Sequence, residues 1–206
     1  GLDVSPCSSI YFVQCENNNL TWLHFAGCWN LTSILANNNN IGAIDVSFLN
    51  LQFLELNNNP IGSINVSGCI NLVGLLLDNT GISTLILPNS TSLGGFNAAG
   101  NTITSIDLSP APNMQWIDLS NNQLSSIDLS VVPSLGLLWC SDNQISSLDL
   151  THTPGMFDLR VENNLINSLD AGAVTGLHTF FCSNNNLGVL DLSNNTSLKW
   201  FQADGN

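Results

Sequence analysis

The sequence predicts a β-rich solenoid with a parallel sheet on its concave face and little or no helix. Three observations predict this fold. An apolar skeleton recurs with a period of about 21 residues, apolar residues return at fixed positions of each copy, and an asparagine recurs at one position of nearly every copy. A fixed period of this length is typical of solenoids, in which each repeat packs only on its neighbours.

The repeat is clearest in residues 114–134, MQWIDLSNNQLSSIDLSVVPS. Copies are evenly spaced, except that the second step is one residue shorter, and begin at Ile10, Leu31, Leu51, Leu72, Leu93, Met114, Leu135, Met156, Leu177 and Leu198. Residues 1–206 are therefore expected to form a single solenoid with nine full repeats and a partial repeat at each end. Such open ends fit an excerpt of a longer chain or copies that stack head to tail.

Positions within a copy, counted from its first residue, indicate the local structure. Positions 1, 4, 6, 11, 14 and 16 are apolar almost throughout, and positions 4 and 6 alternate as a short strand with one buried face requires. Positions 14–16 predict a second short strand or an extended turn. The short polar turn that closes each copy leaves no room for long helices on the convex side.

An asparagine at position 9 predicts a ladder inside the coil. A buried asparagine can donate and accept hydrogen bonds, so it can satisfy backbone groups at the bend after each strand. Thr80 is the single exception in a column formed by Asn18, Asn39, Asn59, Asn101, Asn122, Asn143, Asn164, Asn185 and Asn206.

The phrase L-x-x-L-x-[LC]-x-x-N-x-L resembles the leucine-rich repeat. The form of this length with "SNNQLSSIDLS" and "CSDNQISSLDL" looks like the type found in bacterial surface or secreted proteins. This resemblance covers essentially the whole chain and implies a right-handed coil. It implies a role in adhesion or recognition, because such repeats bind proteins or glycans.

Charge restricts the partners. Fifteen acidic residues face two basic ones, Arg160 and Lys199, which gives a formal net charge of −13. Nucleic acid is not expected as a partner, because binding phosphates requires clustered lysine or arginine. No apolar run approaches the length of a membrane span, so no membrane insertion is expected. The polar but mostly uncharged surface favours an extracellular or cell-surface location.

The six cysteines divide between two positions. Cys15, Cys140 and Cys182 occupy position 6 and are expected to be buried apolar residues, with no metal role. Cys7 and Cys28 occupy position 19 of adjacent coils about 5 Å apart, which predicts a disulfide, with two reduced thiols as the alternative. Six N-x-S/T sequons mark possible N-glycosylation sites at Asn19, Asn30, Asn65, Asn89, Asn194 and Asn195.

No catalytic constellation is found, so we expect no enzyme, cofactor or metal. The histidines fall at different positions of the coil, and a Ser-His-Asp arrangement requires them to converge. Aspartates recur at position 15, namely Asp45, Asp107, Asp128, Asp149, Asp170 and Asp191. Their mutual repulsion could be offset by amides, by the following serines or by cations, and plain solvated carboxylates are the simplest interpretation.

Aromatic residues gather on the outward face of the last five strands. With two others they form the predicted ligand-binding set, Trp116, Trp139, Phe157, Arg160, His178, Phe181 and Trp200. Arg160 lies between Trp139 and Phe181 in one column, so its guanidinium is expected to stack between the two rings. The alternative is that the aromatics only stabilise the sheet through pairs on the same face.

These observations predict a non-enzymatic, extracellular recognition or adhesion module that binds a protein or a glycan on the concave face. One alternative is a structural subunit that stacks head to tail into a filament or fibre. Another is the receptor-binding fibre of a virion.

Overall fold

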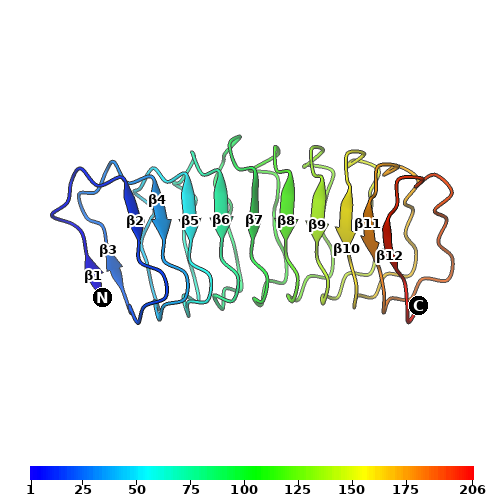
Figure 1. Cartoon of the computed structure of the whole chain (residues 1–206), viewed down its shortest axis with the longest axis horizontal. Helices are drawn as coiled ribbons and strands as arrows, with labels where there is room; N and C mark the ends of the chain where they lie inside the picture. The colour runs from blue at the N-terminus through cyan, green and yellow to red at the C-terminus, as the bar shows by residue number, and fades with distance from the viewer.

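A computed structural model describes residues 1–206 and shows an elongated coil with the same short strand in every turn (Figure 1). Ten strands form one parallel sheet in the order β12-β11-β10-β9-β8-β7-β6-β5-β4-β2. They are β2 Phe12–Gln14, β4 Ser33–Leu35, β5 Phe53–Glu55, β6 Gly74–Leu76, β7 Gly95–Asn97, β8 Trp116–Asp118, β9 Leu137–Trp139, β10 Asp158–Arg160, β11 Thr179–Phe181 and β12 Trp200–Gln202.

The register follows the repeat. Phe12 pairs with Ser33, one full repeat further along the chain, and Ser33 pairs with Phe53 across the single shorter step. A second sheet of two strands, β1 Leu2–Asp3 and β3 Leu23–His24, lies at positions 14 and 15 of the first coils. In later coils the same positions form no strand, so the predicted second strand occurs only in the first coils.

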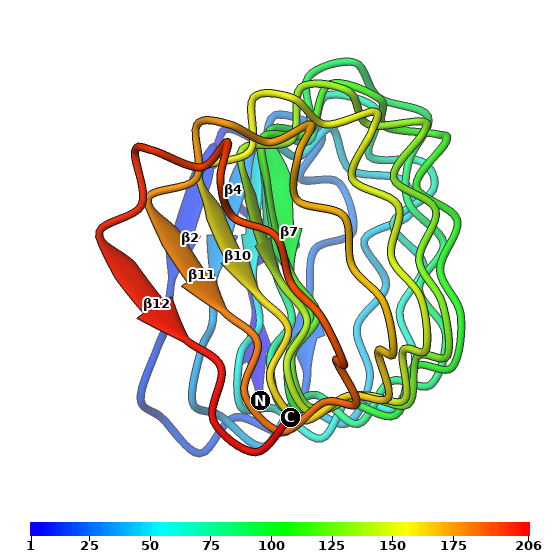
Figure 2. The same ribbon diagram turned by 90° about the vertical axis from the view of Figure 1, so that its right-hand side faces the viewer.

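Figure 2 shows the sheet on one side of the coil and the return segments, without helices, on the other. The structure therefore confirms the predicted parallel-sheet solenoid, and none of its segments forms a helix able to cross a membrane. The fold places one outward-facing strip of side chains, two per strand, along the whole length of the sheet.

Apolar side chains fill the interior of the coil. The central residue of each strand points inward, and Ile117, Leu138 and Leu159 are fully buried. Position 6 is also buried, as Leu119 and Cys140 show. Fifty-one buried apolar residues form one continuous cluster from Val13 to Cys182. Because each coil covers its neighbour, this core supplies the hydrophobic stabilisation of the solenoid.

The asparagine ladder is present, and its geometry is the same in coil after coil. In one coil the Asn143 Nδ2 donates to the carbonyl oxygens of Leu119 at 2.9 Å, Cys140 at 3.1 Å and Ser141 at 3.2 Å. Its Oδ1 accepts from the Leu124 amide at 2.9 Å. From Asn39 onward, each asparagine of the ladder connects its own coil to the preceding one, whereas Asn18 bonds only within its own coil.

Thr80, the exception in the ladder, occupies the same position and makes fewer hydrogen bonds. Its hydroxyl donates to the Leu77 carbonyl at 2.7 Å. The next asparagine compensates, because the Asn101 Oδ1 accepts from the amides of Thr80 and Ile82.

A second row of amides runs beside the first, one position earlier in each copy. Residues at position 8 have positive φ, a conformation that asparagine and aspartate adopt more readily than most residues. They are Asn17, Asn38, Asn58, Asn79, Asn121, Asp142, Asn163 and Asn184, with φ between 54° and 57°. Several join their neighbours on the surface, as in the bond of 2.8 Å from Asn163 Nδ2 to Asp142 Oδ1.

Candidate binding surface on the sheet

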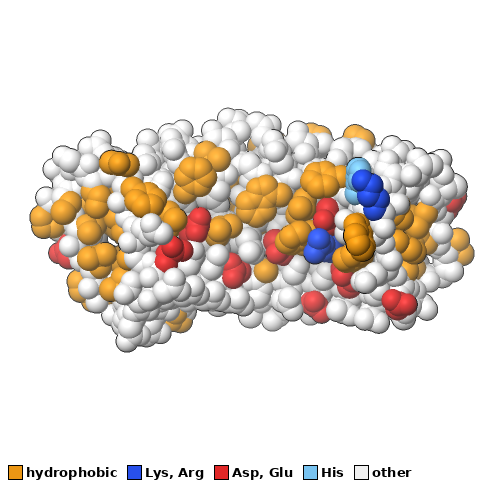
Figure 3. Space-filling view, in the orientation of Figure 1, with side chains coloured by type: hydrophobic (Ala, Val, Ile, Leu, Met, Phe, Trp, Pro, Cys, Tyr) orange, Lys and Arg blue, Asp and Glu red, His pale blue; other side chains and the backbone are white.

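The outward side chains of the ten-stranded sheet form the sheet face, which is the surface seen in Figure 3. Each three-residue strand directs its first and third side chains to this face and its middle one into the core. In β8, Trp116 and Asp118 are half-buried on the sheet face while Ile117 is fully buried. The strand register then fixes which residues lie side by side.

Five aromatic side chains at the carboxy-terminal half of the sheet face form what we call the aromatic surface. They are Trp116, Trp139, Phe157, Phe181 and Trp200. Phe157 is 48% exposed and Trp200 is 67% exposed, whereas the other three are half-buried. Large apolar patches cover this region of the sheet face in Figure 3. Exposed aromatic groups gathered on one face are typical of interaction surfaces.

Glycines on the preceding strands make room for two of these rings. A Cβ atom at Gly95 would overlap both the carbonyl oxygen and the indole of Trp116. A Cβ atom at Gly136 would lie 2.6 Å from the Phe157 ring. The rings therefore lie over the bare backbone of the neighbouring strand, and this packing holds them in place.

Arg160 stacks between two rings, as the register predicted. Its guanidinium carbon lies 4.3 Å from the ring centroid of Trp139 and 5.4 Å from that of Phe181. Both distances are within the range of a cation–π interaction. The sheet face thus carries a preformed stack of one cation and two aromatic rings.

Asp158 holds this stack together, and the sequence analysis missed it. Its two carboxylate oxygens accept from Arg160 Nε at 3.0 Å and Nη2 at 3.1 Å. Oδ1 also accepts from Trp139 Nε1 at 3.0 Å. The signal was present in the sequence, because Asp158 and Arg160 are the first and third residues of β10 and so face the same side.

Both basic side chains of the chain lie on the sheet face, where they are the two blue groups of Figure 3. The Lys199 amide donates to the His178 carbonyl at 2.9 Å, so these two residues are neighbours on adjacent coils. His178 is exposed, and its Nδ1 is 2.9 Å from the Gly176 carbonyl oxygen. The structure therefore places every residue of the predicted ligand-binding set on this face.

A second exposed aromatic group lies near the first coils and was not predicted. Trp29 is 65% exposed, and its ring meets that of Phe48 edge to face with centroids 5.7 Å apart. Tyr11 is 71% exposed in the same part of the chain. Elsewhere in the first coils, the Asn37 Nδ2 donates to both Glu16 and Glu55 at 2.8 Å.

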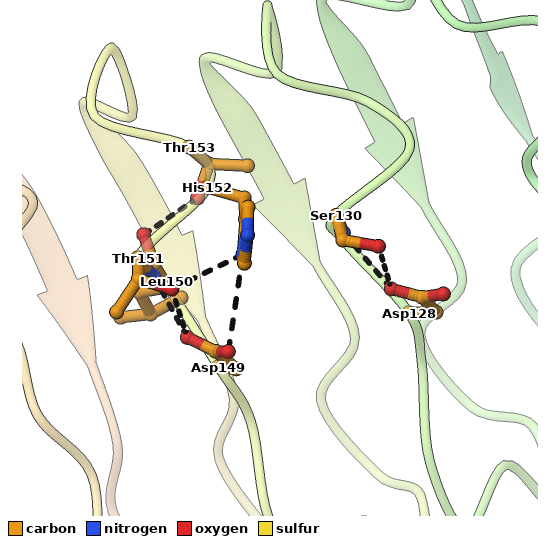
Figure 4. Close-up of polar contacts among 7 residues, drawn as sticks. All are labelled: Asp128, Ser130, Asp149, Leu150, Thr151, His152 and Thr153. Carbon is orange, nitrogen blue, oxygen red and sulfur yellow. Dashed lines mark hydrogen bonds and ion pairs between the residues drawn. The ribbon is translucent and has the colours of Figure 1, made fainter.

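The aspartates at position 15 lie away from the sheet and form closed turns. Asp128 Oδ1 accepts from the Ser130 hydroxyl at 2.7 Å and from its amide at 2.9 Å (Figure 4). Asp149 makes the same two bonds with Thr151. These hydroxyl and amide hydrogen bonds lower the pKa of both carboxyl groups. The hydrogen bonds from the residue two positions further on, which are one of the expected ways to offset the repulsion between these carboxylates, are therefore present.

The predicted Cys7–Cys28 disulfide is absent, because all six cysteines are free thiols. Position 19 points into the coil, so Cys28 is fully buried and its Sγ lies 3.2 Å from the Val4 carbonyl oxygen, whereas Cys7 is exposed. Cys69 adopts the same inward position. Burial raises the pKa of Cys140 to about 12 and that of Cys182 to about 11.

Five of the six sequon asparagines are exposed, namely Asn19, Asn30, Asn65, Asn89 and Asn194. Asn195 differs and corrects the prediction for that residue. It occupies the inward position 19, is 4% exposed, and donates through Nδ2 to the carbonyls of Ala171 at 3.1 Å and Val174 at 2.9 Å. Its side chain is therefore inaccessible to a glycosylating enzyme in the folded chain.

The sequence matches no protein-family model and no curated protein. Among solved structures, it is similar to the functional domain of InlJ from Listeria monocytogenes, which includes a cysteine ladder, with a TM-score of 0.95 and 28% identity. That match covers 99% of this chain and 46% of the other. YopM, a leucine-rich effector protein from Yersinia pestis, matches with a TM-score of 0.78 and 25% identity over 90% of this chain and 52% of the other.

The chain thus spans about half the length of these two bacterial chains. The same fold occurs in the TLR13–ssRNA13 complex, with a TM-score of 0.66 and 20% identity over 90% of this chain and 32% of the other. The repeat architecture is shared with these structures.

Proposed function

We propose that this leucine-rich-repeat chain, with its coils of bacterial type, is a non-enzymatic recognition module whose ligand binds the carboxy-terminal half of the sheet face. The single observation that carries this proposal is the aromatic surface from Trp116 to Trp200. Exposed aromatic groups disfavour solubility unless a ligand covers them, and they supply much of the energy of protein interfaces.

A protein ligand fits this surface best. Contacts within the chain already fix the rings: Phe157 packs over Gly136, and Trp139 contacts Asp158 and Arg160. The rings therefore lose little conformational entropy when a ligand binds. The net charge of −13 disfavours nucleic acid and anionic membranes in this chain. A glycan stacked on an exposed ring such as Trp200 is the alternative ligand. We assign an extracellular or cell-surface location, which the sparsely charged, asparagine-rich surface supports.

The proposal is tested by probing the immobilised chain against protein and glycan arrays. The double variant Phe157→Ala/Trp200→Ala removes the two most exposed rings of the aromatic surface. Trp29→Ala is the matched control, because Trp29 is as exposed as Trp200 but lies outside that surface. We expect array signals that survive Trp29→Ala and fall at least tenfold in the double variant. Identical profiles for the wild type and the double variant would reject the aromatic surface as the binding site.

A further inference from the structure

A pocket of about 390 Å³ opens on the sheet face beside the Arg160 stack. It is lined by Leu76, Asn97, Trp116, Asp118, Leu137 and Trp139. Two indoles and two leucines supply apolar walls, and Asp118 is the only charged group of the lining. The pocket spans β6 to β9, and no residue of β10 contributes to it.

The charge of Asp118 is not paired within the chain. Its Oδ1 accepts from the Ser120 amide at 3.0 Å, and no basic side chain reaches it. Arg160 is bound to Asp158, and Lys199 lies near the end of the sheet. A second carboxyl group, Asp78, lies close enough to interact with Asp118: burial, and to a smaller extent the charge of Asp118, raises the pKa of Asp78. A half-buried carboxylate between apolar walls attracts a cation more strongly than one in open water.

The molecule itself shows which cation suits these walls. In the strand register, Trp139 has Arg160 as its neighbour on one side and Asp118 on the other. On the Arg160 side, a guanidinium lies over the Trp139 ring at 4.3 Å and makes a two-pronged ion pair with Asp158. On the Asp118 side, the same combination of an indole and a carboxylate is present without a guanidinium.

We propose that this pocket receives an arginine side chain from a basic segment of a protein partner, with its guanidinium between the Trp116 and Trp139 walls and paired with Asp118. This inference rests on the proposed function, since it names the partner that the sheet face recognises. Cation–π contacts and a charge-assisted hydrogen bond would act together at the pocket. The net charge of −13 would accelerate encounter with a basic segment.

The test measures binding of an acetylated, amidated hexa-arginine peptide to the folded chain by isothermal titration calorimetry. Asp118→Asn keeps the acceptor for the Ser120 amide but removes the charge, and it should weaken binding about tenfold or more. Asp128→Asn is the matched control, because it removes the same charge and keeps the same kind of turn away from the sheet. It should change the affinity less than twofold. Trp116→Leu should weaken binding, whereas Trp116→Phe should retain most of it.

Equal losses in Asp118→Asn and Asp128→Asn would show general attraction to an acidic chain and would overturn the proposal. Equal affinity for hexalysine would overturn the assignment to a guanidinium. Saturation by choline that depends on Asp118, without binding of hexa-arginine, would assign the pocket to a small ammonium ligand instead. The two proposals can fail separately. If array partners no longer bind the Phe157→Ala/Trp200→Ala variant but still bind Asp118→Asn, the sheet-face function is supported and the arginine pocket is rejected.

Discussion

Replacing Asn143 by alanine should lower the free energy of unfolding by about 2–4 kcal/mol, and the structure shows where this loss arises. Asn143 is buried, and its Oδ1 accepts from the Leu124 amide at 2.9 Å, which has no other partner. An orphaned buried amide costs about 1–3 kcal/mol. The three carbonyls that Asn143 contacts each keep another donor, such as Asn164 Nδ2 on the Cys140 oxygen at 3.0 Å, so they add less.

Urea unfolding followed by circular dichroism measures this loss, and native-state hydrogen exchange at the Leu124 amide locates it. Gln144→Ala is the control, because it removes an exposed amide from the adjacent residue and should change stability by about 0.5 kcal/mol or less. If Asn143→Ala matched this control and the Leu124 amide stayed protected, the ladder would not stabilise the contact between coils.

Three further predictions concern packing, thiols and pH. Gly95→Ala should destabilise the chain by about 1–3 kcal/mol in urea because its Cβ meets backbone and indole, whereas Gly155→Ala, which meets no atom within 4 Å, should be tolerated. Iodoacetamide should modify Cys7 rapidly in the folded chain and the buried thiols Cys140 and Cys182 only on unfolding; rapid reaction of a buried thiol would contradict the fold. Four carboxyls at position 15, those of Asp107, Asp128, Asp149 and Asp191, have lowered pKa values, so their stabilisation is present above the unfolded value of about 4 and is lost as pH falls through the folded values. The urea midpoint should therefore be flat between about pH 6 and 8 and fall below about pH 4.

The fold could be predicted because each coil repeats the same physical requirements. Leu138 and Cys140 had to point inward from a strand, and Asn143 had to satisfy the bend that follows it. The periodicity of the sequence contains this information directly. The stacking of Arg160 on Trp139 could also be predicted, because the register places residues one repeat apart side by side.

Position 19 shows what the sequence analysis missed. The spacing of adjacent coils predicts the Cys7–Cys28 disulfide, and the sequon predicts Asn195 as a glycosylation site, but neither pattern indicates which way the side chains at position 19 point. The column is inward, as fully buried Cys28, Ala111 and Val132 show, and its small or apolar residues were the signal. A turn can direct one side chain into the core while its backbone lies at the surface. Because the column mixes Cys, Ala, Val, Thr and Asn, its inward direction is hard to recognise from the sequence.

The candidate site was predicted in its members but not in its contacts. The sequence places Asp158 and Arg160 on the same face of β10, but the hydrogen bonds of Asp158 to both Arg160 and Trp139 depend on side-chain rotamers, which the register does not specify. The packing of Trp116 over Gly95 and of Phe157 over Gly136 likewise depends on where the rings lie, which the repeat does not specify. The repeat does not specify the ligand, which has to be inferred from the outward-facing residues that differ from copy to copy.

The most direct test of the proposed binding surface is hydroxyl-radical footprinting of the chain with and without a partner selected on the protein array. The proposal predicts protection of Trp116, Phe157 and Trp200 on the sheet face. Trp29 and Ile86, which are 65% and 70% exposed and lie outside the aromatic surface, should be labelled equally in both states. Protection of Ile86 or Trp29 with unchanged labelling of the aromatic surface would contradict the central claim.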